Sequence, residues 1–124
     1  MALFNDEPAA DAVEILLQKA GLGTNRLLLC VVNWGEIYYS VTRGASLEMA
    51  EQKAKEIAAV PIEVVPVEAD LHLVRQAAIY KATHKLSYAD AFAGALAKIR
   101  KAELVTGDME FKALEKEIKI AWLQ

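Results

Sequence analysis

Three acidic residues stand where a carboxylate can take part in chemistry, because each lies beside the expected end of a strand or the start of a helix. Glu36 follows shortly after an apolar run that ends at Val32. Asp90 lies one turn into an expected helix, and Asp108 follows the short run 103–106. In a parallel α/β topology such positions meet at one edge of the sheet, so the three carboxylates are expected to lie together.

A group of carboxylates suits Mg²⁺ or Mn²⁺, which are hard cations that prefer oxygen ligands. Such a cation lowers the pKa of a bound water and stabilises the charge that develops on a phosphate. The expected reaction is therefore metal-assisted hydrolysis of a phosphodiester. Zinc is disfavoured because His72, His84 and Cys30 show no ligand spacing, and no Ser-His-Asp arrangement or glycine-rich phosphate loop is present.

Each candidate residue also has a purely structural interpretation. Ser87 and Asp90 fit a helix capping box, and this role is compatible with metal binding by the same aspartate. Asp108 follows a glycine, which is a common turn pair. Glu36 fits a solvated charge on an amphipathic helix that includes Trp34.

Strands and long helices alternate along the chain and must position these residues. Continuous or alternating apolar runs predict strands over residues 26–32, 62–67, 103–106 and 118–123. Apolar spacing, capping residues and glycine stops predict helices over residues 6–20, 33–43, 46–59, 68–84 and 87–101. Helical crossovers of this length indicate an α/β fold, a three-layer α/β/α domain with a mostly parallel central sheet.

Composition limits the classes of protein that this chain can belong to. Its 124 residues, 55 % of them hydrophobic, predict one domain over residues 1–124 with its own core. The one cysteine, Cys30, lies in an apolar run, which suits a reducing, cytoplasmic setting. No apolar stretch reaches the roughly 18 residues that span a bilayer, and no secretion signal is evident.

A net charge of −3 leaves no general basic field for binding nucleic acid, so contact with RNA would need a local patch. Basic residues that could bind RNA phosphates gather near the Asp90 helix: Lys81, Lys85, Lys98, Arg100 and Lys101. Solvated helix faces explain them equally well. Tyr88 and Trp34 could stack on bases, although packing in a core or interface is the more common role of such rings.

Several segments in series resemble one known family. Leu86-Ser-Tyr-Ala-Asp-Ala-Phe92 followed by Leu104-Val-Thr-Gly-Asp-Met-Glu-Phe111 resembles the C-terminal half of PIN domains, metal-dependent ribonucleases that include the VapC toxins. Asn33-Trp-Gly-Glu-Ile-Tyr-Tyr39 resembles the glutamate-bearing helix of the family. Leu3-Phe-Asn-Asp-Glu-Pro8 resembles the junction after its first strand. The order of these segments matches the family over essentially the whole chain.

The resemblance implies a Mg²⁺- or Mn²⁺-dependent endoribonuclease of a toxin-antitoxin system, with RNA as substrate, a protein antitoxin as partner and a homodimeric assembly. It implies acidic metal-site residues at Glu36, Asp90 and Asp108, and polar residues that orient carboxylates, water or phosphate at Ser87, Thr106 and Asn33. Two alternatives remain. One is a non-catalytic PIN-like protein that binds RNA, an antitoxin or its own copy, and the other is a general α/β binding domain with accidental carboxylates.

The chain departs from the family at its N-terminus. PIN domains resembling this one start with a strand that carries an Asp-x-Ser or Asp-x-Thr pattern, whereas Met1 stands inside that element. The first strand and its acidic residue are therefore expected to be absent from this chain. Asp6, Asp11 and Asp70 are not substitutes, because none of them falls at the matching position. With fewer carboxylates to hold a cation, impaired catalysis is expected.

The expected missing strand belongs at the centre of the sheet, between the strands over residues 27–32 and 103–106. Its loss would leave unpaired backbone groups and an uncovered apolar slot, both of which cost free energy. Three outcomes are expected as alternatives. The two flanking strands pair directly, another segment or subunit fills the gap, or the natural product starts upstream of Met1.

Overall fold

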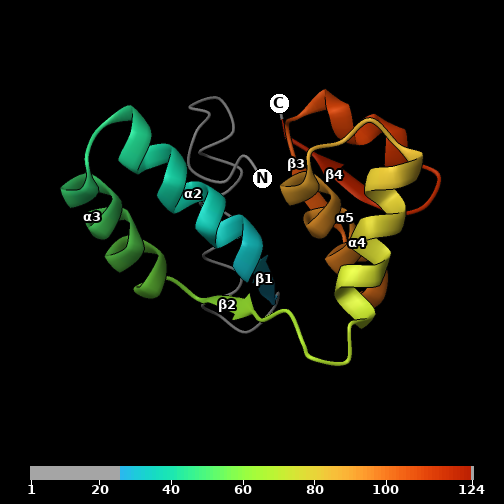
Figure 1. The fold of residues 1–124 in the computed structure, drawn as a ribbon, viewed down its shortest axis with the longest axis horizontal. Helices are drawn as coiled ribbons and strands as arrows, with labels where there is room; N and C mark the ends of the chain where they lie inside the picture. The colour runs from blue at the N-terminus through green and yellow to red at the C-terminus, as the bar shows by residue number, and fades with distance from the viewer. Residues whose placement is uncertain (1–25, 124) are drawn as a thin grey trace.

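The computed structural model describes residues 26–123, and it separates into two groups of elements along its longest axis (Figure 1). The first group contains β1 (Leu27–Cys30), α2 (Val31–Gly44), α3 (Leu47–Ala58) and β2 (Ile62–Val65). The second contains α4 (His72–Thr83), α5 (Tyr88–Arg100), β3 (Leu104–Thr106), the 3₁₀ helix η1 (Met109–Leu114) and β4 (Ile120–Trp122). The helix expected over residues 6–20 lies outside the described residues. None of the described helices is long and apolar enough to cross a membrane.

The strands form two parallel pairs. β1 pairs with β2, so that Leu29 lies opposite Val64, and β3 pairs with β4, so that Thr106 lies opposite Trp122. Every strand of residues 26–123 thus runs parallel to its neighbour, as the alternation of strands and helices predicted. Direct pairing of β1 with β3, one of the three expected outcomes, does not occur in this part of the chain.

An apolar cavity lies between the two pairs, and it marks the position where the sequence predicted an uncovered slot. Its described lining includes Leu28 and Cys30 of β1, Leu104 of β3 and Leu96 of α5. β1 and β3 lie too far apart to exchange backbone hydrogen bonds there, since each pairs with one strand only among the described residues. Among residues 26–123, no strand lies between β1 and β3 to pair with both, as the sequence predicted.

Helix α5 is the centre of the larger hydrophobic core. All of its residues from Ala91 to Ala97 are buried. Tyr80 of α4 and Phe111 and Leu114 of η1 belong to the same cluster. A helix that is apolar on all sides must be covered on all sides, and the alanines of α5 allow α4 and η1 to approach closely. A smaller cluster beneath α2 and α3 contains Leu29, Ile37 and Ile57.

Helix α2 begins earlier than its apolar sequence suggested. The run through Val32 was predicted to be a strand, yet β1 ends at Cys30 and the helix begins at the next residue. The side-chain amide of Asn33, which is buried, donates a hydrogen bond to the backbone oxygen of Ala89 at 2.8 Å. This contact ties the first turn of α2 to the first turn of α5. A short apolar run fits strand or helix equally well, so tertiary contacts decided its conformation.

The start of α4 also differs from the predicted one. Leu73, Ala77 and Tyr80 form the buried face of the helix, whereas Leu71 and Ala78 are exposed. Leu71 precedes the helix with a left-handed φ of 66°. The helix therefore starts after this residue, at His72, whereas the sequence predicted a start at residue 68.

Close packing at Gly94 yields a stability prediction. A Cβ at this position would lie 2.5 Å from Cδ1 of Leu114, a fully buried side chain of η1. Gly94→Ala should therefore lower the free energy of unfolding by about 1–3 kcal/mol, the usual cost of overpacking. Gly35→Ala is the matched control, since a Cβ there meets no atom within 4 Å in the helical α2. It should raise the stability by about 0.5–1 kcal/mol.

Urea denaturation followed by circular dichroism measures both changes. A gain in stability at both positions would show that α5 and η1 do not approach each other as closely as the structure indicates.

Candidate metal centre

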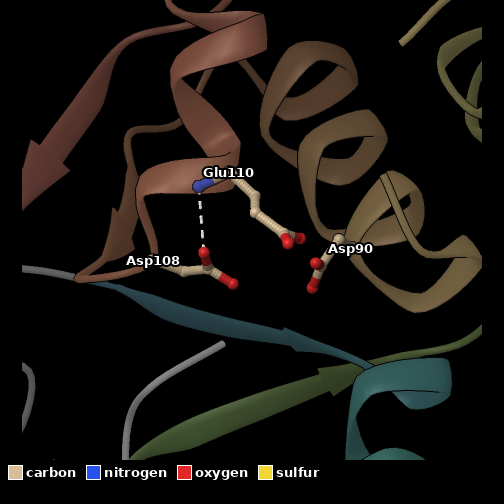
Figure 2. A group of neighbouring side chains, drawn as sticks. All are labelled: Asp90, Asp108 and Glu110. Atoms are coloured by element: carbon tan, nitrogen blue, oxygen red, sulfur yellow. Dashed lines mark hydrogen bonds between the residues drawn. The ribbon is translucent and has the colours of Figure 1, made fainter. Parts of the chain in front are cut away.

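Three carboxylates meet where α5 and η1 begin. Asp90, Asp108 and Glu110 each offer an oxygen, and these oxygens all lie within 4.8 Å of one another. Figure 2 shows the three side chains directed toward a common region from two separate elements. Asp90 and Asp108 were both predicted to belong to one site, and the fold brings them together. Glu110 was not predicted.

Asp90 is held by the first turn of α5. Ser87 is the N-cap of this helix, and its Oγ accepts a hydrogen bond from the backbone N–H of Asp90 at 3.1 Å. The expected capping contact is therefore present at the backbone N–H of Asp90. The side chain is buried and faces the other two acids (Figure 2). Capping and participation in the cluster are thus compatible.

Asp108 and Glu110 are placed by a short series of hydrogen bonds after β3. Thr106 is fully buried at the end of this strand, and its Oγ1 accepts from the backbone N–H of Asp108 at 3.0 Å. Oδ1 of Asp108 then accepts from the backbone N–H of Glu110 at 2.9 Å, which caps η1 (Figure 2). This turn directs both carboxylates toward α5. The capped Asp-Met-Glu sequence is the one local signal that could have indicated Glu110.

The cluster concentrates negative charge in a partly buried place. Burial raises the pKa of the Asp90 carboxyl above its ordinary value, and the nearby charge of Asp108 raises it further, while the hydrogen bond with Ser87 acts in the opposite direction. The two ion pairs found among residues 26–123 lie elsewhere, at Arg26–Glu63 and Lys53–Glu56. A divalent cation would relieve the repulsion between these carboxylates.

Glu36 occupies a different place from the other predicted acids. It is half-buried on α2 and is not one of the three carboxylates whose oxygens lie within 4.8 Å of one another. Residues three apart share a helix face, so Glu36 lies on the same side of α2 as Asn33. That asparagine contacts Ala89, the residue before Asp90. Glu36 therefore lies one helical turn from a direct link to the cluster, and its role in metal binding stays a prediction.

Comparison with known proteins identifies the fold. The family model described as PIN domain matches residues 1–117, so the resemblance found in the sequence is confirmed. No curated protein matches the chain. Two solved structures have similar folds, VapBC2 from Rickettsia felis bound to a DNA fragment from its promoter and DNA-bound VapBC from Salmonella typhimurium.

The two likenesses extend over nearly the full chain. The Rickettsia felis structure has a TM-score of 0.71 at 15 % identity and covers 99 % of this chain and 91 % of the other. The Salmonella typhimurium structure has a TM-score of 0.69 at 17 % identity, with coverages of 99 % and 90 %. At such low identity these likenesses show a shared fold.

The raised pKa of Asp90 predicts how the metal-free protein responds to pH. A carboxyl with a raised pKa binds its proton more tightly in the folded state than in the unfolded chain. Stability therefore falls as the pH rises from the unfolded-state pKa toward the folded-state pKa. In EDTA at pH 7, Asp90→Asn should raise the melting temperature, because it removes a buried charge. The gain should shrink as the pH is lowered toward 4.

Thermal melts of both proteins across this pH range make the comparison. Glu68→Gln serves as the control, because Glu68 is an exposed residue outside the cluster. A melting temperature of Asp90→Asn below that of the wild type at pH 7 in EDTA would contradict the charge argument.

Proposed function

The chain belongs to the PIN domain family, and we propose that it is an endoribonuclease of a toxin-antitoxin system that uses Mg²⁺ or Mn²⁺ to hydrolyse RNA phosphodiester bonds. The observation that carries this proposal is the convergence of Asp90, Asp108 and Glu110 at the starts of α5 and η1. Asp90 is distant in sequence from Asp108 and Glu110, and capping alone does not require the three carboxylates to share one region.

The donor set fits the proposed cations. Its members are all carboxylate oxygens, which are the ligands that Mg²⁺ and Mn²⁺ prefer over softer nitrogen and sulfur donors. Asp90 is buried, whereas Asp108 and Glu110 are exposed, so the cluster is open to solvent on one side. Water and a phosphate oxygen can complete the coordination from that side. A bound cation would supply an activated water and charge stabilisation on the phosphate.

The residues of the chain then have separate tasks. Asp90 and Asp108 would hold the cation, because the backbone N–H of Asp90 donates to Oγ of Ser87 and Oδ1 of Asp108 accepts from the backbone N–H of Glu110. A carboxylate oxygen of Glu110 accepts a hydrogen bond from the attacking water and then its proton. Ser87 and Thr106 keep the backbone of Asp90 and Asp108 in place through their hydroxyl oxygens. Positioning of this kind keeps ligands ready for the metal without rearrangement.

Helix α2 contributes to the proposed site through its contact with the residue that precedes Asp90. The amide of Asn33 holds the first turn of α2 against Ala89. Glu36, one turn further along the same side, is proposed as a fourth carboxylate that helps to bind the cation or the substrate. Its half-buried position leaves part of the side chain accessible for this purpose.

The biological setting is part of the same proposal. Both similar structures are VapBC complexes bound to DNA. By this likeness, a protein antitoxin is the proposed partner of this chain, which is proposed to act on RNA in the cytoplasm as a homodimer. The non-catalytic alternative, a PIN-like protein that binds RNA, an antitoxin or its own copy, predicts binding without cleavage.

The nuclease proposal predicts metal-dependent cleavage that needs both aspartates. The wild type should cleave a fluorescently labelled single-stranded RNA in Mn²⁺ and lose this activity in EDTA. Asp90→Asn and Asp108→Asn should each lower kcat/KM by about 100-fold, equivalent to roughly 2.7 kcal/mol of transition-state stabilisation. Glu68→Gln is the matched carboxylate-to-amide control and should leave cleavage unchanged.

Equal Mn²⁺-dependent activity of all four proteins would end the nuclease proposal. RNA binding by the wild type without any cleavage would instead favour the non-catalytic alternative.

Glu110 and Glu36 can be separated by metal titration. Glu110→Gln should weaken Mn²⁺ binding by about tenfold, a change of roughly 1.4 kcal/mol, because it removes one charge from the cluster. Glu36→Gln should have a smaller effect, since Glu36 is outside the group of three. Isothermal titration calorimetry measures both. If Glu36→Gln weakens binding more than Glu110→Gln, the cation is held mainly from α2, and the assignment of Glu110 is wrong.

A further inference from the structure

A half-exposed tryptophan ends the strand next to the carboxylate cluster. Trp122 is the last residue of β4, and 38 % of its surface is accessible. The parallel register places it opposite Thr106, at the spacing of about 4.8 Å that separates adjacent strands. The hydroxyl oxygen of Thr106 accepts the hydrogen bond that positions Asp108. The indole is therefore attached beside the residue that fixes one of the proposed metal ligands.

The backbone around Trp122 is held firmly. The backbone N–H of Leu123 donates to the carbonyl oxygen of Thr106 at 2.9 Å, so β4 stays paired with β3 on both sides of the tryptophan. A side chain on such a backbone is displayed in a fixed place. Aromatic rings on rigid strands are suitable platforms for stacking because little conformational freedom is lost when a ligand binds.

Trp122 differs from the other tryptophan in its aromatic contacts. The other tryptophan, Trp34, is stacked on Tyr38 with 5.4 Å between ring centroids and 18° between planes. Trp122 has no comparable ring contact among residues 26–123. Met109, which directly follows Asp108, is 63 % exposed. Met109 is thus an accessible apolar side chain next to Asp108 in sequence, and Trp122 is an accessible one on the strand that pairs with Thr106.

We infer that Trp122 stacks on an unpaired base beside the phosphate at the carboxylate cluster, so that the site selects single-stranded RNA. This inference rests on the proposed nuclease function and names the form of its substrate. In a duplex both faces of a base are covered by its neighbours, whereas single strands offer unstacked bases to aromatic side chains.

The negative net charge of the chain favours RNA binding that relies partly on base stacking rather than on charge alone. The net charge is −3, and the cluster adds local negative charge beside the place where a phosphate would bind. The chain as a whole therefore offers no general electrostatic attraction for RNA, and its exposed basic residues near α5 could act only as a local patch. Stacking on an indole supplies affinity that depends only weakly on salt, which suits a site of this composition.

Binding of a short single-stranded RNA tests the inference, with Ca²⁺ in place of Mn²⁺ so that binding is followed apart from cleavage. Trp122→Ala should weaken binding by about tenfold, a typical loss for one stacked base, and Trp122→Phe should retain most of the affinity. Trp34→Phe is the matched control and should bind like the wild type. Fluorescence anisotropy of labelled RNA measures the affinities, and thermal melts verify that each variant is folded.

Three further comparisons identify stacking itself. RNA should quench tryptophan fluorescence in the wild type and in Trp34→Phe, but not in Trp122→Phe. The same sequence as a duplex should bind Trp122→Ala and the wild type equally. In Mn²⁺, Trp122→Ala should raise KM for the single strand with little change in kcat.

The outcomes separate this inference from the function on which it rests. If Asp108→Asn abolishes cleavage but folded Trp122→Ala binds single strands like the wild type, stacking is wrong and the nuclease function stands. If Trp122→Ala changes only self-association measured by size-exclusion chromatography, the surface binds protein, and the inference is also wrong. If the wild type neither binds nor cleaves RNA, the proposed function and the inference fail together.

Discussion

The buried carboxylate of Asp90 beside two other acids is the constraint on which the rest of this structure depends. Burial and like charge both disfavour its ionised form, so the surrounding structure must offset that cost. The alanines and Gly94 of α5 let neighbouring elements pack tightly around the helix, and Ser87 caps its first turn. Asn33 ties α2 to that same turn. The core of the domain and the proposed site therefore share one helix.

The other half of the cluster is fixed by much shorter-range interactions. Thr106, Asp108 and Glu110 are joined in sequence by two hydrogen bonds, which turn the chain directly after β3. The turn leads directly into η1, and Leu114 of η1 packs against Gly94 of α5. Packing between α5 and η1 thus sets the separation of the carboxylates. Functional groups that repel one another oppose folding, and packing elsewhere in the fold commonly offsets that cost.

The described strands form two separate pairs, and α5 contacts one strand of each pair. An apolar cavity separates β1 from β3 beneath α5, yet both pairs run parallel and α5 contacts both. Helix packing, rather than a continuous ladder of backbone hydrogen bonds, holds the described halves together. A gap at the centre of the sheet was expected from the comparison of the sequence with the PIN pattern.

By itself the sequence determined the α/β class, the caps of α3 and α5, and the candidates Asp90 and Asp108, because capping patterns and apolar periods reflect contacts within a few residues. Only the tertiary structure decided that β1 stops at Cys30, that Glu110 joins the cluster, and that Glu36 lies outside it. The physical reason is distance along the chain. A local pattern specifies the direction of a side chain relative to its own helix, whereas packing between elements sets which carboxylates meet.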